Sequence, residues 1–363
     1  MLVEFYFNNQ LIPITNIEEI RIRESINSPI IEGEILIFDF NLIDYKTIKD
    51  QKQIPINFIV YDQIEDENKE LIFTVTELEG GTTQTQNKIA IGFTNRNSID
   101  LVSKFTTAYF NDIKYSKMLI QTLSSVGFKS KALESGNKET RYFPYSSGLE
   151  KIRYIQERIV DKNNRAGYLI FPDLFTNEQN IINLNHIIEG NFGTYEYPLF
   201  KNYENVAYIG HIDEILTIKN YDVMKFIEVS SANRYTFNMN SGIVENSEQD
   251  ITLIKNLPLL LNKEYLKTEY NKREFTVFSN KNGLNNFNSN EFYKFIQNQI
   301  VINCVANGDW NRKVGYLIAM IAYKDDTSGS VLDEKLSGKF IIKDVEHVFN
   351  QHNYMQNMNL IKI

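Results

Sequence analysis

The sequence predicts a mainly β protein with α+β insertions, built around two homologous antiparallel β-barrels. Runs of alternating apolar and polar residues fill residues 1–108 and return toward the C-terminus. Between them, residues 109–215 change to helical spacing of the apolar positions. A heptapeptide of the pattern F-x-(V/I)-x-(D/E)-(L/V)-E also occurs twice, as FTVTELE at 73–79 and FIIKDVE at 340–346. These three observations together predict the fold class.

Composition limits the function classes. A chain of 363 residues can hold two or more domains and bury a sizeable core. The formal net charge of −8 disfavours a surface that binds DNA nonspecifically, because phosphate binding needs clustered Lys and Arg. The opening residues MLVEFYFNNQ lack the pattern of a signal peptide, and the longest apolar run, VGYLIAMIAY, is too short to span a bilayer as a helix. We therefore expect no membrane insertion.

Residues 1–108 are predicted to form the first barrel. EIRIRESI alternates apolar and polar residues with period two, and NSP marks the turn after it. EILIFDF is a nearly continuous apolar run, which predicts a strand buried on both faces. IPINFIVYD is a further strand, and the GGTTQTQN loop between LIFTVTELE and KIAIGFTN indicates a hairpin.

Residues 109–215 are predicted to form an α+β insertion. SKMLIQTLSSVGF has helical spacing and ends at a glycine. Ser147 and Glu150 fit a capping box at the start of a second helix, which we expect to run to about residue 160. Its buried stripe is expected to comprise Leu149, Ile152, Ile155 and Ile159. AGYLIF and NIINLNHIIEG are expected to be short strands.

The strand pattern of the second barrel is expected in residues 216–246 and 295–363, around a polar, Asn-rich insertion at 247–294. The repeated heptapeptide lies near the end of each β region and is followed by a polar turn and a second alternating run. This shared context predicts an internal duplication in which Phe73 corresponds to Phe340 and Glu79 to Glu346.

The titratable residues suggest no chemistry. The single cysteine, Cys304, cannot form a disulfide within the chain and lies in an apolar run, so we expect a buried, inert thiol. The four histidines, His186, His211, His347 and His352, have no Cys or carboxylate spacing that would complete a zinc site. His347 and His352 flank a predicted hairpin turn and are interpreted as surface or cross-strand residues.

Further motifs lack residues that their chemistry requires. LSGKF has Asp333 where a phosphate-binding loop needs glycine and Phe340 where it needs Ser or Thr. DKNNRAGYLIFP, from Asp161, has Ala166 and Pro172 where a calcium loop needs Gly and Glu, so a turn after a helix is expected. The adjacent carboxylates Glu18–Glu19 and Asp325–Asp326 are not marked as an acid/base pair, and no G-x-S-x-G occurs. We predict no catalytic, metal or cofactor-binding residue, and no enzyme.

Taken in order, several segments resemble the baseplate central hub protein of contractile-tailed bacteriophages, the T-even-like hub family that includes the hub half of the secretion spike protein VgrG. They are IEEIRIRESINSPIIEGEILIFDFN, YFPYSSGLEKIRYIQERIVDKNNRAGYLIF and the closing VANGDWNRKVGYLIAMI and KLSGKFIIKDVEHVFNQHNYMQNMNLIKI. The resemblance covers most of the chain and departs from the family pattern at 247–294.

The resemblance implies two tube-like β-barrels per chain and a homotrimer whose six barrels form a pseudo-sixfold ring, in the tail baseplate of a virion assembled in the host cytoplasm. Implied partners are the central spike protein, the tail tube or tube-initiator protein, the tape measure protein and the baseplate wedge proteins. DNA would only pass through the lumen, which the net charge predicts to be neutral or negative.

Three alternatives remain open at this point. The chain could be the hub of a contractile secretion or toxin-delivery machine, or a receptor- or carbohydrate-binding tail module. A hydrolase would need a convergent polar pocket that sequence spacing does not reveal.

Overall fold

The computed structural model describes residues 3–38, 54–62, 67–82, 87–163, 165–201, 210–219, 231–238, 243–250, 273–278, 301–324, 331–334, 336–351 and 353–363. Strands dominate these residues, which confirms the mainly β class. None of the helices in these ranges is long and apolar enough to cross a membrane.

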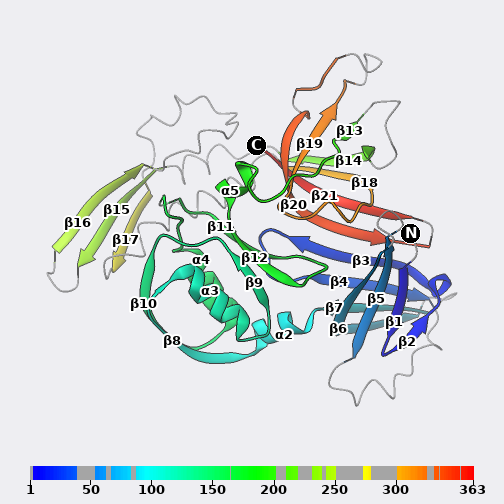
Figure 1. Ribbon diagram of the computed structural model, residues 1–363, viewed down its shortest axis with the longest axis horizontal. Helices are drawn as coiled ribbons and strands as arrows, with labels where there is room; N and C mark the ends of the chain where they lie inside the picture. The colour runs from blue at the N-terminus through cyan, green and yellow to red at the C-terminus, as the bar shows by residue number, and fades with distance from the viewer. Residues whose placement is uncertain are drawn as a thin grey trace.

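Most strands belong to one large sheet, made by two β modules (Figure 1). The first β module contains β1 (Val3–Phe7), β2 (Gln10–Ile12), β3 (Ile17–Ser25), β4 (Glu32–Phe38), β5 (Pro55–Asp62), β6 (Glu67–Thr82) and β7 (Asn87–Thr94). The second β module contains β13 (Leu199–Lys201), β14 (Ile212–Lys219), β18 (Val301–Asn307), β19 (Leu317–Ala322), β20 (Gly338–Phe349) and β21 (Tyr354–Lys362). The order is β14-β18-β21-β20-β3-β4-β7-β6-β5-β1-β2, and β19 pairs with both β20 and β13.

The two modules share one strand order. The first follows β3-β4-β7-β6-β5 and the second follows β14-β18-β21-β20-β19, with every pair along both paths antiparallel. Each strand of the first path therefore has a counterpart in the second. In the second module a bridge between Phe200 and His211 brings β13 close to the start of β14. With this bridge, the strands of the second module nearly close into a barrel.

Irregularities in the strand pairing fall at matching places. The β6–β7 register shifts between Val75 and Glu77, and the β20–β21 register shifts between Ile342 and Asp344. With Phe73 aligned to Phe340, these two shifts coincide. Because a bulge inserts one residue at a defined place and is a designed feature of a strand pair, this coincidence supports the predicted duplication.

A second repeat marks the opposite end of each module. The β3–β4 register shifts between Ile17 and Glu19, and the β14–β18 register shifts between Ile212 and Glu214. The segments are IEEI at 17–20 and IDEI at 212–215. The sequence analysis missed this repeat, although it was visible in the letters.

Each module curls around its own hydrophobic core. The core of the first module is rich in Ile and Phe, and that of the second also contains Cys304, Met320 and Met358. Phe73 and Phe340, the first residues of the repeated heptapeptide, are both buried in these cores. The same sequence position therefore supplies a core phenylalanine in both modules.

The strand pairing in the described part of residues 212–278 assigns these residues to different sheets from those that the sequence predicted. β14 already begins at Ile212, before the expected start of the second barrel at 216. β15 (Ser231–Asn238) pairs with both β16 (Ile243–Asp250) and β17 (Arg273–Phe278) in a separate three-stranded sheet. Residues 231–238 and 243–246, which we expected in the second barrel, therefore lie outside the large sheet, because their backbone partners are each other and β17.

Two local predictions for the first module were wrong. β4 has only one buried face, with Ile35 and Ile37 inside and Leu36 partly exposed, because the sheet has a core on one side only. Residues 96–103, expected to be extended, form the helix α2 (Arg96–Ser103), whose N-cap is the side chain of Asn95. The cap satisfies a free backbone N–H at the helix start.

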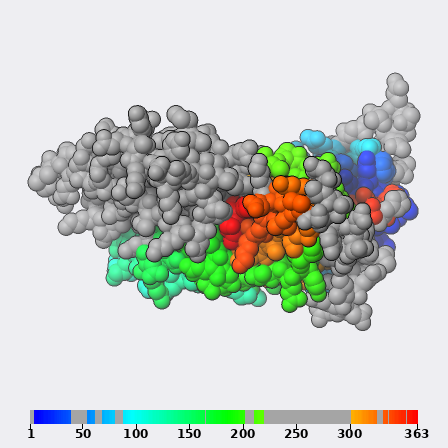
Figure 2. All heavy atoms as spheres, turned by 90° about the horizontal axis from the view of Figure 1, so that it is seen from above, coloured from blue at the N-terminus to red at the C-terminus, as the bar shows by residue number. Residues whose placement is uncertain are grey.

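The insertion packs helices on a small sheet. The helices are α3 (Tyr115–Ser124), α4 (Gly148–Gln156) and α5 (Leu184–Ile188), and the strands are β9 (Lys129–Ala132), β11 (Tyr168–Pro172) and β12 (Glu178–Asn183). A separate two-stranded ribbon consists of β8 (Phe105–Lys114) and β10 (Lys138–Ser147). Thr194 forms a parallel bridge with Leu317 of β19, and residues of this part of the chain (green) lie directly against the second module (orange) in Figure 2.

The predicted capping box of α4 is confirmed. Ser147 Oγ accepts from Glu150 N at 3.2 Å, and the Glu150 carboxylate accepts from Ser147 N at 2.7 Å. Ile152, Ile155 and Ile159 are fully buried, as predicted. The helix ends at Gln156, earlier than expected, so Ile159 reaches the core from the turn that follows.

Candidate functional site: the seam between the two β modules

The two modules are joined by antiparallel pairing of β3 with β20, which we call the seam. The pairs run from Ser25–Asp344 to Ile20–Phe349. The first half of β20 pairs with β19 of its own module, and the second half pairs with β3. One strand thus carries the sheet from one module into the other.

A buried polar group locks the core side of the seam. His347 Nε2 lies 2.9 Å from Glu24 Oε1 on β3, and His347 Nδ1 lies 2.8 Å from Tyr354 Oη on β21. Trp310 stacks on the His347 ring, with the ring centroids 4.9 Å apart. Burial raises the pKa of Tyr354 well above its usual value. Because buried polar groups are tolerated only when they are hydrogen-bonded, this set fixes how the modules meet.

A second buried group supports the loop after β18. The guanidinium of Arg312, which is fully buried, donates from NH1 to the Asn307 carbonyl at 2.6 Å and to Gln356 Oε1 at 3.1 Å. The Tyr195 hydroxyl donates to the Asp309 carboxylate. Burial, followed by the hydrogen bond to Asp309, raises the pKa of Tyr195. The segment that carries Trp310 is therefore held in place from both sides.

The insertion is tied to this segment by an ion pair. Lys313 Nζ lies 2.9 Å from Asp173 Oδ2, in the turn between β11 and β12. Burial would raise the pKa of Asp173, but the Lys313 ammonium outweighs it and the pKa lies below its usual value. The ammonium and the carboxylate also line a pocket of about 310 Å³ that includes Trp310 and His347.

The face of the sheet that points away from the cores, which we call the outer face, is polar at the seam. Arg23 Nε lies 2.6 Å from Glu346 Oε1, and Asn357 Nδ2 donates to Glu346 Oε2 at 2.8 Å. Ser25 Oγ donates to Asp344 Oδ1 at 2.5 Å. Burial would raise the pKa of Glu346, but the contacts with Arg23 and Asn357 lower it below its usual value. A groove of about 330 Å³ follows the seam on this face.

The outer face stays polar on both sides of the seam. Cross-strand pairing places one set of carboxylates on it from β3, β4, β6 and β20, and these are Glu19, Glu32, Glu34, Glu77, Glu79, Asp344 and Glu346. The cations in the same registers are Arg21, Arg23 and Lys88. Carboxylates outnumber cations, so this face carries net negative charge. Residues directly opposite each other across a strand pair share a face.

The described histidines lie on separate elements. His347 lies in the seam and is buried, contrary to a surface location, but it is a cross-strand residue as expected. His211 lies at the start of β14, with Nε2 3.9 Å from Asp213 Oδ1, and His186 lies on α5. His352 lies outside the described residues. No cluster of His, Cys, Asp and Glu suited to a metal ion occurs within the described ranges.

The remaining candidate groups have structural partners. Glu18 pairs with Lys88 at 2.7 Å, and its neighbour Glu19 pairs with Arg21, so the two carboxylates point to different cations. Asp325 and Asp326 lie outside the described residues. Cys304 is fully buried, and burial raises the pKa of its thiol to about 12, which fits the predicted inert thiol. Lys339 lies at the start of β20, a strand, so the LSGKF segment does not have the loop-to-helix context of a phosphate site.

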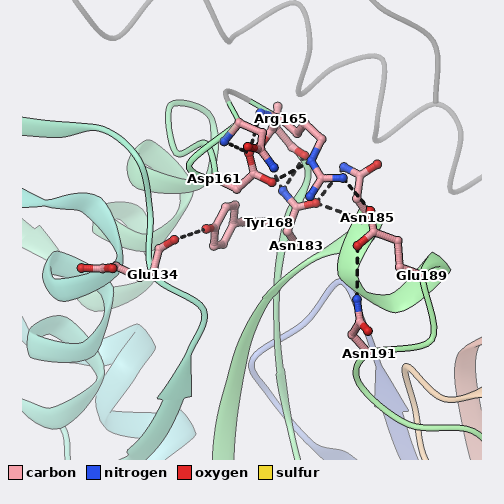
Figure 3. A network of polar contacts seen from close by, with 10 residues as sticks. Glu134, Asp161, Arg165, Tyr168, Asn183, Asn185, Glu189 and Asn191 are labelled. Carbon is pink, nitrogen blue, oxygen red and sulfur yellow. Dashed lines mark hydrogen bonds and ion pairs between the residues drawn. The ribbon is translucent and has the colours of Figure 1, made fainter. Parts of the chain in front are cut away.

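The loop that begins at Asp161 uses its carboxylate internally (Figure 3). Asp161 accepts from the backbone N–H groups of Asn163 and Arg165, each at 2.8 Å, and from Arg165 Nε at 2.7 Å. Arg165 also reaches Glu189 Oε1 at 2.7 Å, and Asn183 Nδ2 donates to the Ala166 carbonyl at 2.8 Å. This network closes the turn after α4 onto α5.

An exposed aromatic group on the β8–β10 ribbon was not anticipated, because these residues were interpreted as strand positions. Tyr109 and Tyr142 face each other across the ribbon and are 65% and 57% exposed. Phe105 stacks with Tyr145 at a centroid distance of 5.6 Å. The seam itself was also missed, because its strands lie more than 300 residues apart in the chain.

Comparison with known proteins gives a structural likeness only. No protein-family model matches the sequence, and no curated protein does. The fold is similar to a 43 kDa tail protein of prophage MuSo2 from Shewanella oneidensis, with 11% identity, 99% of this chain and 97% of that chain covered, and a TM-score of 0.58. It is also similar to a tail protein from Neisseria meningitidis MC58, with 7% identity, coverage of 99% and 96%, and a TM-score of 0.62. A chain of the half-lidded Francisella PdpA–VgrG complex matches with 9% identity, coverage of 99% and 57%, and a TM-score of 0.51.

Proposed function

We propose that this protein is the structural hub of a phage contractile-tail baseplate, a homotrimer that joins the tail tube to the central spike and carries out no chemistry. Its other partners would be the tape measure protein and the baseplate wedge proteins. The likeness to two tail proteins, one of them from a prophage, over nearly the whole length of all three chains supports the fold on which this proposal rests.

The single observation that carries the proposal is the continuous sheet with its acidic outer face. A sheet that passes without interruption from one β module into the next is suited to building the wall of a ring. A wall lined by Glu34, Glu77, Glu79 and their neighbours repels phosphate, since like charges raise the free energy of contact. DNA could then pass through the ring without being retained.

The proposal assigns roles to the parts of the chain. The first module, residues 1–108 in the sequence prediction, and the second module would form the ring, with the second starting at about 212 and continuing through 301–363. The insertion between them would lie outside the wall and contact baseplate partners. We assign the separate sheet of β15, β16 and β17 to a further insertion that enlarges the predicted one at 247–294.

Electron microscopy of the purified full-length chain tests the hub, and a gel-shift assay with a short DNA duplex tests the acidic wall. We expect rings with threefold symmetry and a central channel, and no DNA binding at physiological salt. The double variant Glu77→Lys with Glu79→Lys should gain DNA binding, whereas Asp100→Lys with Glu196→Lys, which lie off the outer face, should not. A chain that is monomeric under all conditions contradicts the hub, and a wild-type ring that binds DNA contradicts the wall.

A hub of a contractile secretion or toxin-delivery machine is the second candidate, and the likeness to a chain of the PdpA–VgrG complex favours it. Mass spectrometry of purified particles separates the two. Detection of this chain together with capsid proteins supports the phage tail, and detection with membrane-anchoring components supports the secretion machine.

A further inference from the structure

The duplication gives every strand contact of one module a counterpart in the other. At the seam, β3 of the first module lies along the second half of β20. The counterpart of β3 is β14, and the counterpart of β20 is β6, from the shared strand order and the coincident bulges. A contact between two modules that repeated the seam would therefore place β14 along the second half of β6.

Both of these strands have an open edge. β6 pairs with β5 only through Glu67–Thr74, so on that side Glu77–Thr82 face no other described strand. This division copies β20, which pairs with β19 through its first half and leaves its second half for β3. Among the described strands, β14 ends the large sheet and forms a ladder with β18 alone, apart from the single bridge between Phe200 and His211 at its start.

We propose that β14 of one chain pairs in antiparallel fashion with the second half of β6 of the next chain, in the register of the seam. This proposal rests on the trimeric hub proposed above and names the surface through which its chains join. The alignments Ile17 to Ile212 and Phe73 to Phe340, together with the extra residue that a second bulge inserts in β14 between Ile215 and Thr217, convert the seam pair Arg23–Glu346 into Lys219–Glu79 between chains. The next outer-face pair, Arg21–Val348, becomes Thr217–Gly81.

The side chains of β14 provide an independent reason. Leu216 and Ile218 are 46% and 50% exposed, although they lie on an edge strand. Proteins protect free edges with charges, proline or a covering element, because an exposed apolar edge strand pairs with other chains. Gly81 has no side chain, so it leaves room opposite Thr217. This apolar edge of β14 is therefore better suited to pairing with a second copy of this chain than to exposure to water.

Disulfide trapping tests the register, because Cys304 is buried and will not interfere. The chain with Glu79→Cys and Lys219→Cys is oxidised and run on a non-reducing denaturing gel. We expect covalent dimers and trimers that collapse to monomer on reduction. The matched control is Arg23→Cys with Glu346→Cys, the seam pair itself, which should cross-link within one chain without raising its mass. Glu79→Cys with Thr217→Cys is shifted by two residues, so its Cβ atoms would lie about 7 Å apart, too far for a disulfide.

Mass photometry of the same samples separates failure of the interface from failure of the hub. If the chain with Glu79→Cys and Lys219→Cys forms a trimer but gives no interchain product, while the seam control cross-links, the proposed pairing is overturned and the trimeric hub stands. A trimer that cross-links only in the shifted pair overturns the register. A chain that stays monomeric and uncross-linked at every concentration overturns both the pairing and the proposed hub.

Discussion

The seam and the open edge use the same backbone geometry with different side chains. At the seam, β3 carries Arg23 opposite Glu346 and has Glu24 buried against His347. On β14 the counterpart of Ile22 is Ile218, which is 50% exposed where Ile22 is 1% exposed. A neighbour within the chain is always present, so a buried polar network there is permanently satisfied. A strand that must remain folded before its partner arrives cannot depend on such a network.

The cores of the two modules differ in a similar way. In the first, Phe58, Phe73 and Phe93 pack together, with ring centroids 4.9 to 5.7 Å apart. In the second, Phe340 packs among aliphatic and sulfur-containing side chains such as Met358. The position of one phenylalanine has been kept while its surroundings have changed, which indicates that strand order and bulges hold the fold more firmly than any particular core packing.

Truncation of the shared phenylalanine gives the largest expected effect. Phe73→Ala and Phe340→Ala should each lower the free energy of unfolding by about 3–5 kcal/mol, because each removes a fully buried ring and leaves a cavity. Urea unfolding followed by fluorescence of Trp310, the single tryptophan, measures the change. Ile72→Ala, at a site 63% exposed, is the control and should stay within about 0.5 kcal/mol. A cost below about 1 kcal/mol at one of the two phenylalanines would break the equivalence of the modules.

The buried pair of the seam gives the next effect. Glu24→Ala should lower the free energy of unfolding by about 3 kcal/mol, because it leaves His347 buried without its carboxylate partner. Glu24→Gln should recover part of this loss, since an amide oxygen can still accept from the imidazole. Glu32→Ala, on the exposed side of the neighbouring strand, is the control. If Glu24→Ala unfolds like the parent chain, the polar network does not hold the modules together.

Much of the fold could be predicted from local patterns. Period-two alternation identified β3, β6 and β7, and the Ser147–Glu150 spacing identified the start of α4. α2 was missed because it is short and buries only Ser98 and Leu101, too few residues to show a helical period.

The seam could not be predicted in the same way. Alternation in a strand shows that one face is buried, but it does not say which strand lies alongside, and β3 and β20 are far apart in the chain. The short IEEI and IDEI repeat was the available signal. With the heptapeptide, it marks both strands that meet at the seam and both of their counterparts.

The exposed ion pair of the seam gives a smaller, pH-dependent effect. Arg23→Ala should cost about 0.5–1 kcal/mol at pH 7, because Arg23 is half exposed and solvent screens the pair. The pKa of Glu346 lies below the usual 4.5, so its contribution is present above the unfolded pKa and is lost as pH falls through the folded pKa. The difference between parent and variant in urea midpoint should therefore shrink as pH falls below the usual pKa of 4.5. A difference that does not change as the carboxylate is protonated would assign the effect to packing of the Arg23 stem instead of its charge.

The open edge gives the smallest effect on the single chain and the clearest contrast with the seam. Ile218→Ser should change the free energy of unfolding by less than about 0.5 kcal/mol at concentrations where the chain is monomeric, because the side chain is half exposed. Association stabilises the folded state by mass action, so the melting temperature of the parent chain should rise with protein concentration. Ile218→Ser should flatten this rise, because a hydroxymethyl group recovers less free energy than a sec-butyl group when β6 of the next chain covers it. Leu11→Ser, at an equally exposed site on β2 at the far end of the sheet, should keep the full concentration dependence. If Leu11→Ser weakens the concentration dependence of the melting temperature and Ile218→Ser does not, the chains join at the β2 end of the sheet. The contact seen at the seam is then not repeated between chains.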